Sequence, residues 1–493
     1  MLLLGIDIGT SSIKVSVVDA QTQKTVASAQ YPETESPITT LHPGWAEQSP
    51  GMWWQHVQQA IKMCNQSGKY NPQDIAAIGI AYQMHGLVLV DKEQNLLRDS
   101  IIWCDSRAVQ LGDQAFDAIG HDKCLAHLLN SPGNFTASKL AWVKQNEPQI
   151  YAQIDKIMLP GDYIAMKLSG EITTSISALS EGVFFDFVNN SISKDIINHY
   201  GFSESLFPRV QQVFSDHGGV LPSIAQQLGL KAGIPIAYKA GDQPNNALSL
   251  NVLNPGEVAA TAGTSGVIYG VSDKLTYDPQ SRVNTFAHVN YTEQQKSLGV
   301  LLCINGTGSL YRWTKNLFGS AVNYSQMNTE AAKAPLGSDG LRILPFGNGA
   351  ERMLNNELIG VHFHNIDLNL HTQAHIFRAV QEGITSAFRY GVDIMRENGM
   401  NPTVIRAGKA NLFLSDLFAQ TFVNATGIPV ELYNNDGSVG AALGAGIGSG
   451  IFSSPQEAFK QMQPLQLIEP NTDAFEPVYQ EWRSLLLKQL SIS

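Results

Sequence analysis

Length, composition and charge set the first limits on this chain. Its 493 residues are too many for one ordinary hydrophobic core and predict two or three domains. Hydrophobic residues make up 43% and charged residues 15%, which is typical of a globular protein. The net charge of -11 argues against a general affinity for nucleic acid or an anionic membrane, although one loop of backbone amides could still bind phosphate.

Short apolar segments alternate with helical patterns through the first half. Leu2–Ile8 and Lys14–Asp19 predict two strands joined by a tight turn. Apolar residues at helical spacing predict a helix over Met52–Cys64. The pattern then predicts a second strand pair and two helical segments, over Ile75–Ala81, Leu87–Val90, Phe135–Gln145 and Gln149–Ile157. Strands that alternate with helices indicate an α/β fold.

The opening pattern returns about half a chain later. Val258–Thr261 and Val267–Val271 predict two strands, and the turn between them nearly repeats the residues of the first turn. Two such turns predict a duplicated domain with a boundary near residue 245, which gives domains of residues 1–245 and 246–493. Near the end, the Gly/Ala-rich segment Gly437–Gly450 predicts a closely packed helix, with or without a ligand against it.

The two glycine turns are candidate phosphate-binding sites. Backbone N–H groups of such a turn point in one direction, and neighbouring hydroxyls add donors. Thr10 and Ser11 in the first turn, and Gly263 and Thr264 in the second, are therefore candidate nucleotide-binding residues. An ordinary hairpin explains either turn alone roughly twice as well. Together they predict two lobes that hold the phosphates of one nucleotide from opposite sides.

Two aspartates are candidates for phosphoryl chemistry. Asp7 ends an apolar strand before the first turn, and a carboxylate beside a phosphate site normally binds Mg²⁺. Asp242 follows Gly241 near the domain boundary, where it could act as a general base on an attacking hydroxyl, with Gln243 and Asn245 orienting that hydroxyl. A turn or helix-capping aspartate explains Asp242 about equally well.

Two polar segments are candidates for binding a sugar. In Gln83-Met84-His85-Gly86, Gln83 and His85 could hydrogen-bond sugar hydroxyls, although a single histidine is more often structural. Trp103 lies close to Asp105 and Arg107, a mixture found in sugar pockets and in ordinary surface salt bridges.

The cysteines and the N-terminus predict a cytoplasmic protein. Cys64, Cys104, Cys124 and Cys303 form no C-x-x-C pair and no zinc pattern, which suits a reducing compartment. Asp7 interrupts the first apolar segment before a signal peptide could form, and no apolar run has membrane-spanning length.

These motifs resemble the FGGY carbohydrate kinases. The similarity is carried by Gly5-Ile6-Asp7-Ile8-Gly9-Thr10-Ser11, Gly241-Asp242-Gln243 and Gly263-Thr264-Ser265. Further segments resemble the xylulokinase branch: His42-Pro43-Gly44-Trp45-Ala46-Glu47-Gln48, Gln83-Met84-His85-Gly86, Ile102-Trp103-Cys104-Asp105-Ser106-Arg107 and Leu159-Pro160-Gly161-Asp162-Tyr163. Phe135–Trp142 is similar to the family's first signature, and the resemblance extends from residue 3 to about 445.

The resemblance implies a fold, a reaction and a site. The fold would be two duplicated ribonuclease-H-like, actin-like ATPase domains with a ligand cleft between them. The reaction would be the phosphorylation of a small sugar by ATP with Mg²⁺, D-xylulose to D-xylulose 5-phosphate being the first expectation. Asp242 would be the catalytic base and, with Asp7, a metal ligand. The implied and inferred sugar residues are Met84, His85, Gln83, Asp105 and Gln243, and the nucleotide residues Thr10, Ser11, Gly263, Thr264, Gly308 and Gly408.

Three segments depart from the family pattern. The usual Gly-Gly-Gly-Ala turn at the adenine reads Arg406-Ala407-Gly408-Lys409, with two bulky side chains. The usual Ser-Gly-Glu-Arg-Thr-Pro loop reads Asn348-Gly349-Ala350-Glu351-Arg352-Met353. The pair Asp242-Gln243 is closer to glycerol and gluconate kinases than to typical xylulokinases.

Several alternatives therefore stay open. The acceptor could be ribulose, fuculose, gluconate or glycerol. A catalytically weak sugar sensor and an actin-like or chaperone-like ATPase are the alternatives from other classes, and sugar-dependent release of ADP separates them from a kinase. Lobes that grip phosphates from both sides also predict closure about a hinge near residues 240–250. The oligomeric state is open, a homodimer included.

Overall fold

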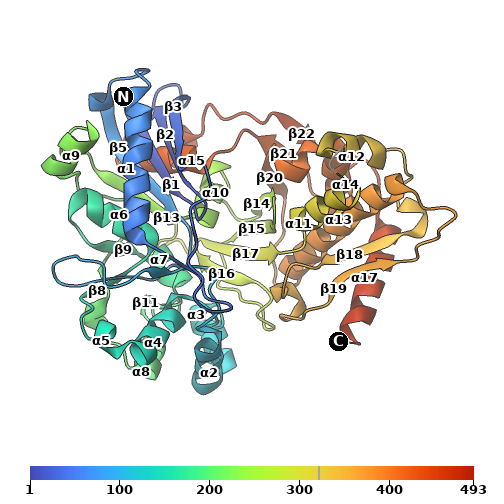
Figure 1. Cartoon of the computed structure of the whole chain (residues 1–493), viewed down its shortest axis with the longest axis horizontal. Coiled ribbons are helices and arrows are strands. Elements are labelled where there is room, and N and C mark those ends of the chain that lie inside the picture. Colours follow the sequence, from blue (N-terminus) through green and yellow to red (C-terminus); the bar gives the residue numbers. More distant parts are fainter. Residues whose placement is uncertain (320–321, 493) are drawn as a thin grey trace.

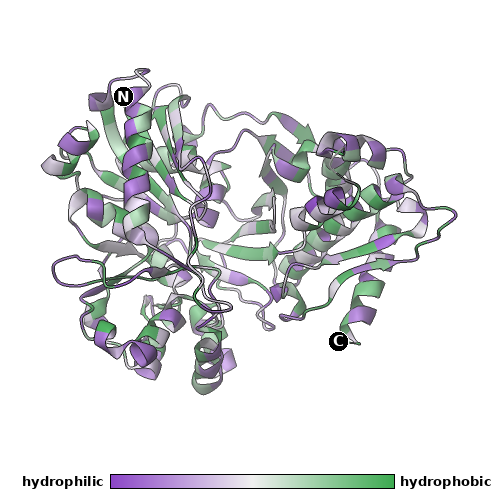
Figure 2. Ribbon diagram, in the orientation of Figure 1, coloured by the Kyte–Doolittle hydropathy of each residue, from purple (hydrophilic) through white to green (hydrophobic). Residues whose placement is uncertain are grey.

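The protein consists of two lobes, each built around one β-sheet (Figure 1). The computed structural model describes residues 1–319 and 322–492. Hydrophobic residues concentrate on the strands and on the helix faces that cover them (Figure 2), so each sheet lies inside its own core.

The sheet of the first lobe has the strand order β13-β5-β1-β2-β3. Its strands are β1 (Leu2–Ile8), β2 (Ile13–Asp19), β3 (Thr25–Tyr31), β5 (Ile75–Tyr82) and β13 (Ile236–Gly241). β1 runs antiparallel to β2 and parallel to β5, and β5 runs parallel to β13. The predicted opening hairpin is confirmed.

The sheet of the second lobe has the strand order β16-β17-β15-β14-β20-β21-β22. Its strands are β14 (Glu257–Ala262), β15 (Gly266–Ser272), β16 (Asn284–Ala287), β17 (Leu298–Ile304), β20 (Val404–Gly408), β21 (Val430–Tyr433) and β22 (Gln466–Ile468). β14 runs antiparallel to β15 and parallel to β20, and β20 runs parallel to β21. The core order β21-β20-β14-β15-β17 thus repeats β13-β5-β1-β2-β3. This is the duplicated ribonuclease-H-like, actin-like arrangement, and the predicted duplication is confirmed.

Helices cover both sheets, and short strands decorate the lobes. The helices of the first half are α1 (Pro50–Gln66), α2 (Val109–Ile119), α3 (His121–Leu128), α4 (Thr136–Asn146), α5 (Pro148–Tyr151), α6 (Pro160–Ser169), α7 (Ile176–Glu181), α8 (Lys194–Tyr200), α9 (Pro222–Leu228) and α10 (Asp242–Ser249). Those of the second half are α11 (Gly308–Leu317), α12 (Tyr324–Ala331), α13 (Gln373–Glu397), α14 (Asp416–Thr426), α15 (Gly437–Gly448), α16 (Pro455–Ala458) and α17 (Glu476–Leu490). The short strands are β4 (Glu47–Gln48), β6 (Val88–Val90), β7 (Ser100–Ile101), β8 (Lys156–Met158), β9 (Thr173–Ser175), β10 (Phe185–Asp186), β11 (Ser191–Ile192), β12 (Arg209–Gln211), β18 (Arg342–Phe346) and β19 (Gly360–His364).

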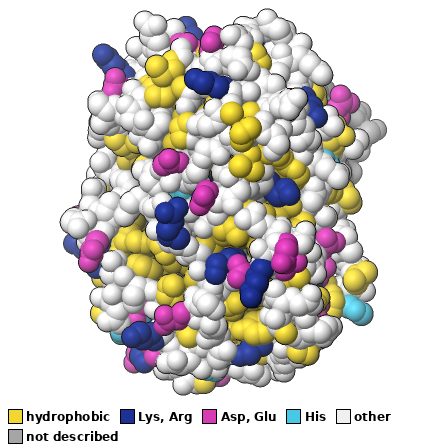
Figure 3. All heavy atoms as spheres, turned by 90° about the vertical axis from the view of Figure 1, so that its left-hand side faces the viewer, with side chains coloured by type: hydrophobic (Ala, Val, Ile, Leu, Met, Phe, Trp, Pro, Cys, Tyr) yellow, Lys and Arg dark blue, Asp and Glu magenta, His cyan; other side chains and the backbone are white. Residues whose placement is uncertain are grey.

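Two further features concern the apolar length of the helices and the charges on the surface. Within residues 1–319 and 322–492, no helix is long and apolar enough to cross a membrane. On the face of the first lobe in Figure 3, basic and acidic side chains are interspersed.

Two predictions about local structure were wrong. Leu87–Val90 was predicted to pair with Ile75–Ala81, but β6 pairs with β8 instead. Gln149–Ile157 was predicted to be helical, but α5 ends at Tyr151 and β8 begins at Lys156. Both errors have one cause: the main chain at Asp155 turns to bond the carbonyl of Val90, a long-range pairing that local periodicity does not report.

Helix α15 comes from the C-terminal half but packs on the sheet of the first lobe. It lies against β1, β5 and β13. The approach requires glycine in the sheet: a Cβ on Gly5 would lie 1.8 Å from the Ser438 oxygen, and one on Gly79 would lie 1.9 Å from the Ala441 oxygen. The predicted close packing of the Gly/Ala-rich segment is thus explained. The domain boundary near residue 245 falls within α10 and stays a prediction.

The substitution Gly79→Ala tests this packing. The added methyl group must push α15 off the sheet, so we expect a loss of about 1–3 kcal/mol in the free energy of unfolding, measured by denaturant titration. Gly51→Ala is the matched control, because its Cβ would meet its nearest neighbours at 3.5 and 3.8 Å. Equal stability of the two variants would contradict close packing at Gly79.

Candidate active site

Two aspartates meet at one edge of the first sheet. β1, β5 and β13 are parallel, so their carboxyl ends lie at the same edge. Asp7 lies near the end of β1, and Asp242 begins α10 directly after β13. Both line a cavity of about 360 Å³, together with Gln243, Gly263 and Thr264. The cavity therefore draws on both lobes.

The environment makes both carboxyl groups more basic. Burial, and then the negative charge of Asp7, raise the pKa of Asp242 to about 7. Hydrogen bonds from the main chain and side chain of Gln243 act the other way and favour the ionised form of Asp242. Burial, and then the charge of Asp436, raise the pKa of Asp7 to about 6. Asp242 can therefore accept a proton near neutral pH.

A larger cavity of about 580 Å³ adjoins the first, and both are lined by Gly263 and Thr264. Its other lining residues include Gly308, Tyr311, Arg312, Tyr324, Asn328 and Asn411. The N-terminus of α11 docks on the shared turn, because the Gly308 N–H donates to the Gly263 carbonyl at 3.0 Å. A Cβ on Gly308 would lie 2.2 Å from that oxygen, so the docking requires glycine.

Three predicted nucleotide residues do not line either cavity. The Thr10 hydroxyl donates to Gln83 at 3.1 Å and accepts from the Trp103 indole at 2.9 Å. Ser11 is exposed, and its carbonyl accepts from Ser36. Gly408 ends β20, where a Cβ would lie 3.4 Å from Asn435. The roles of these three residues stay predictions.

The bulky residues beside Gly408 also lie away from the larger cavity. Arg406 pairs with Glu431 at 2.8 Å and with Glu257 at 3.2 Å. Lys409 donates to the side chain of Gln466 at 3.0 Å. The departure from the family turn therefore leaves the space of the larger cavity open.

The turn after β5, which contains Met84 and His85, packs against Gly241, the residue before Asp242. A Cβ on Gly241 would come 2.6 Å from the Met84 side chain, so the two are in contact. His85 has a left-handed backbone, with φ of 62°, and its ring lies 4.9 Å from Phe135 and 5.5 Å from Phe286 of the second lobe. Gln83 is buried, and its amide group bonds Thr10 and Gln48. Because protein groups occupy its amide, Gln83 could affect a bound sugar only indirectly, through the residues that it bonds.

His85 offers one hydrogen-bond acceptor. Its Nδ1 lies 2.9 Å from the carbonyl oxygen of Glu181, which can only accept, so Nδ1 carries the proton. Burial, and then the charge of Lys139, lower the pKa of His85 to about 3, which keeps the ring neutral. Nε2 then has a lone pair, and the one hydrogen bond of the ring among the described residues is the bond at Nδ1.

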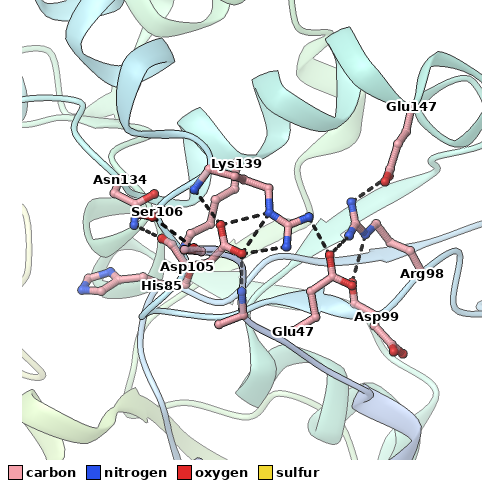
Figure 4. Close-up of polar contacts among 12 residues, drawn as sticks. Glu47, His85, Arg98, Asp99, Asp105, Ser106, Asn134, Lys139 and Glu147 are labelled. Carbon is pink, nitrogen blue, oxygen red and sulfur yellow. Dashed lines mark hydrogen bonds and ion pairs between the residues drawn. The ribbon is translucent and has the colours of Figure 1, made fainter. Parts of the chain in front are cut away.

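Asp105 lies in a buried network of ion pairs (Figure 4). Its carboxylate accepts from the Ala46 N–H at 2.6 Å and pairs with Arg107 at 2.7 Å. Arg107 also pairs with Glu47 at 2.6 Å, and the network continues through Arg98. Since these contacts occupy the Asp105 carboxylate, a direct contact with sugar stays a prediction and is not supported by this geometry.

Sequence reasoning missed several residues of the site. Lys139 on α4 donates to the His85 carbonyl at 2.9 Å, Glu181 ends α7 against His85, and Phe286 comes from β16. Tyr311 and Tyr324, whose rings stack at 5.6 Å, line the larger cavity. The one available signal was Lys139, a charged residue on the apolar face of a predicted helix.

Two family models match nearly the whole chain. The FGGY family of carbohydrate kinases, N-terminal domain, matches residues 2–249. The C-terminal domain of the same family matches residues 258–449. The chain is an FGGY carbohydrate kinase.

Relatives of this FGGY kinase include xylulose kinases. That of Escherichia coli (strain K12) is 28% identical over 502 residues and covers 98% of this chain and 100% of the relative. That of Bacillus subtilis (strain 168) is 28% identical over 473 residues, with 93% and 90% covered. A structure named "xyloylose kinase" from Brucella ovis superposes with a TM-score of 0.91 at 25% identity, covering 100% of both chains. The gluconate kinase of Lactobacillus acidophilus, at 20% identity, covers 99% of this chain and 98% of that chain with a TM-score of 0.90, which shows the fold alone.

His85→Ala in this kinase tests the sugar side of the site. Loss of one buried hydrogen bond, worth about 1 kcal/mol, should raise KM for the sugar about fivefold and leave KM for ATP unchanged. Steady-state kinetics with each substrate varied in turn provide the measurement. His121→Ala, at an exposed histidine of α3, is the control. A rise in KM for ATP instead would place His85 on the nucleotide side.

Proposed function

We propose that this kinase transfers the γ-phosphoryl group of ATP to a terminal hydroxyl of D-xylulose and forms D-xylulose 5-phosphate. The observation that carries the proposal is the pair of cavities that share Gly263 and Thr264. A nucleotide whose base occupied the larger cavity would bring its phosphates to this turn, beside Asp242 in the smaller one. The relatives that are named xylulose kinases supply the acceptor.

Asp242 is the proposed base. As the sugar oxygen attacks phosphorus, its proton passes to the Asp242 carboxylate, which becomes neutral. A base whose pKa is about 7 is well matched to this transfer near neutral pH. Hydrogen bonds from Gln243 favour the ionised form, which is the form that accepts the proton.

Asp7 and Asp242 fit a magnesium ion. The charge of Lys14 favours the ionised form of Asp7, but Lys14 pairs with Asp436 at 2.5 Å, and within the described residues neither Asp7 nor Asp242 forms an ion pair. Mg²⁺ binds oxygen ligands and commonly uses one or two carboxylates with phosphate oxygens and water. No group of three or more metal-binding side chains occurs in the described part of the chain. When bound, Mg²⁺ neutralises charge on the phosphoryl group.

The sugar end of the proposed site recognises a hydroxyl and excludes water. The free lone pair on Nε2 of His85 would accept from a sugar hydroxyl, and Met84 packs against Gly241, the residue before the proposed base. Phe135 and Phe286 enclose the imidazole ring. Exclusion of water matters because water competes with the sugar for the phosphoryl group.

The alternatives from other classes have less support. The argument for a sugar sensor was that bulky Arg406 and Lys409 alter the turn at the adenine. Both side chains, however, bond residues outside the larger cavity. An actin-like or chaperone-like ATPase would not need the hydrogen-bond acceptor that Nε2 of His85 offers. Among kinases, the pair Asp242-Gln243 keeps gluconate and glycerol as rival acceptors, beside ribulose and fuculose.

A panel of acceptors tests the proposed function. ADP release is measured with MgATP and D-xylulose, D-ribulose, L-fuculose, D-gluconate or glycerol. We expect kcat/KM for D-xylulose to exceed the others at least about tenfold, a difference of about 1.4 kcal/mol, and chelation of Mg²⁺ to stop the reaction. A higher value for another acceptor would correct the sugar and keep the reaction. Sugar binding without ADP release would indicate a sensor, and sugar-independent release an ATPase.

Asp242→Asn tests the base. Loss of a general base should lower kcat by about 10²- to 10⁴-fold, while calorimetry should show sugar binding nearly unchanged. Asp122→Asn, at an exposed position of α3, serves as the matched control. A variant that kept more than half of the wild-type kcat would refute the assignment.

A further inference from the structure

Glu181 is a buried acid that the proposed reaction does not use. It is 1% exposed and is the last residue of α7. Burial raises its pKa well above the usual range. Its Oε2 has no hydrogen-bond partner within the described residues. An unpaired buried polar atom costs about 1–3 kcal/mol, so folding alone gives no reason for a carboxyl group here.

Glu181 contacts His85 at two points. Its main-chain oxygen accepts from Nδ1 of His85 at 2.9 Å, and its Oε1 accepts from the His85 N–H at 3.4 Å. On the other side, the His85 carbonyl accepts from Lys139 at 2.9 Å and from the Thr136 hydroxyl at 3.3 Å. The main chain of His85 is therefore held from both sides: Glu181 bonds its N–H group, and Lys139 bonds its carbonyl group.

This hold matters because the backbone of His85 is strained. A left-handed conformation is unfavourable for a residue with a side chain and persists only when its surroundings enforce it. The same conformation directs the ring toward Phe135 and Phe286 and leaves Nε2 free. If the N–H of His85 lost its acceptor, the backbone could leave the left-handed conformation more easily. The ring would then turn, and Nε2 would no longer point in one fixed direction.

Glu181 also touches the strand that carries the base. A Cβ on Gly241 would lie 2.6 Å from Oε2 of Glu181 and 2.6 Å from Cγ of Met84. Gly241 immediately precedes Asp242. One side chain thus packs against the turn of His85 and the end of β13.

Helix α7 gives Glu181 a fixed place because it is bonded to the second lobe. The Ser177 hydroxyl donates to the Ala287 carbonyl at 2.9 Å, and the Ala287 N–H donates to the Ser180 hydroxyl at 2.9 Å. Ala287 ends β16, the edge strand that also carries Phe286. These bonds tie α7, which carries Glu181, to β16, which carries Phe286, and both residues contact His85.

We propose that Glu181 is a positioning residue of the sugar site: its side chain holds His85 in the left-handed conformation that presents Nε2 to a substrate hydroxyl. The proposal rests on the proposed sugar kinase function. It makes Glu181 a determinant of affinity for the acceptor and not for the nucleotide. The residue acts through His85 and does not itself touch the reacting atoms.

Glu181→Leu removes the acceptor for the His85 N–H and keeps a side chain of similar size. We expect KM for the acceptor to rise about three- to tenfold, with KM for ATP unchanged. Thermal stability should not fall, because the unpaired carboxyl oxygen is also removed. Glu181→Gln, which keeps an acceptor oxygen, should recover most of the lost affinity. Glu171→Leu, at an exposed acid of the same lobe, is the matched control.

Two readouts make the test independent of the proposed acceptor. Kinetics use whichever sugar the wild-type enzyme phosphorylates best, and nitrogen NMR of His85 needs no activity. We expect an unprotonated Nε2 in both proteins, because Glu181→Leu keeps the main-chain carbonyl that accepts from Nδ1, and a shifted Nε2 signal in Glu181→Leu as the ring leaves its position. An unchanged KM and an unchanged NMR signal would overturn the proposal, as would lower stability with unchanged KM. If Glu181→Leu does not fold, the same measurements on Glu181→Ala decide, and failure of both to fold would assign Glu181 to folding instead.

Discussion

The site depends on one geometric constraint, the common edge at which parallel strands end. β1, β5 and β13 run in the same direction, so the residues near or after their ends meet. Asp7, His85 and Asp242 are far apart in sequence and come from these ends. The close approach of α15 fixes the same sheet from behind, because Gly5 and Gly79 let the helix backbone lie directly on the strands. The sheet therefore determines together the positions of the residues that we propose to bind the metal ion, bind the sugar and act as the base.

Such a site concentrates charges that repel each other. Burial and neighbouring acids raise the pKa values of Asp7 and Asp242 to about 6 and about 7, so the ionised forms of both carboxyl groups are disfavoured. Asp242 also lies in the first turn of α10, where the helix dipole favours negative charge. Substrate phosphates with a divalent cation would complete the charge balance. Raised pKa values of neighbouring buried acids are typical of functional sites.

The sequence reveals most of this framework but not its inner supports. Repeated Gly-Thr-Ser turns predict the duplication, and Asp7 and Asp242 lie at strand ends that local hydrophobicity already indicates. The pairing of β6 with β8 is missed because it depends on a contact between Asp155 and Val90, distant in sequence. Glu181 and Phe286 are missed for the same reason, since only the assembled lobes bring α7 and β16 to His85. The local sequence pattern predicts strands and helices, whereas contacts between the lobes decide which side chains surround His85.

The edge of β16 has a consequence for how the lobes can move. Side chains of the first lobe take the place of a neighbouring strand: Asn130 bonds both main-chain groups of Thr285, at 2.6 and 3.0 Å, and two serines of α7 bond those of Ala287. A rotation that preserved these bonds would turn about β16 as a pivot. Phe286 would then keep its place beside His85 while parts of the second lobe farther from β16 move, so the proposed acceptor site would stay assembled during nucleotide entry.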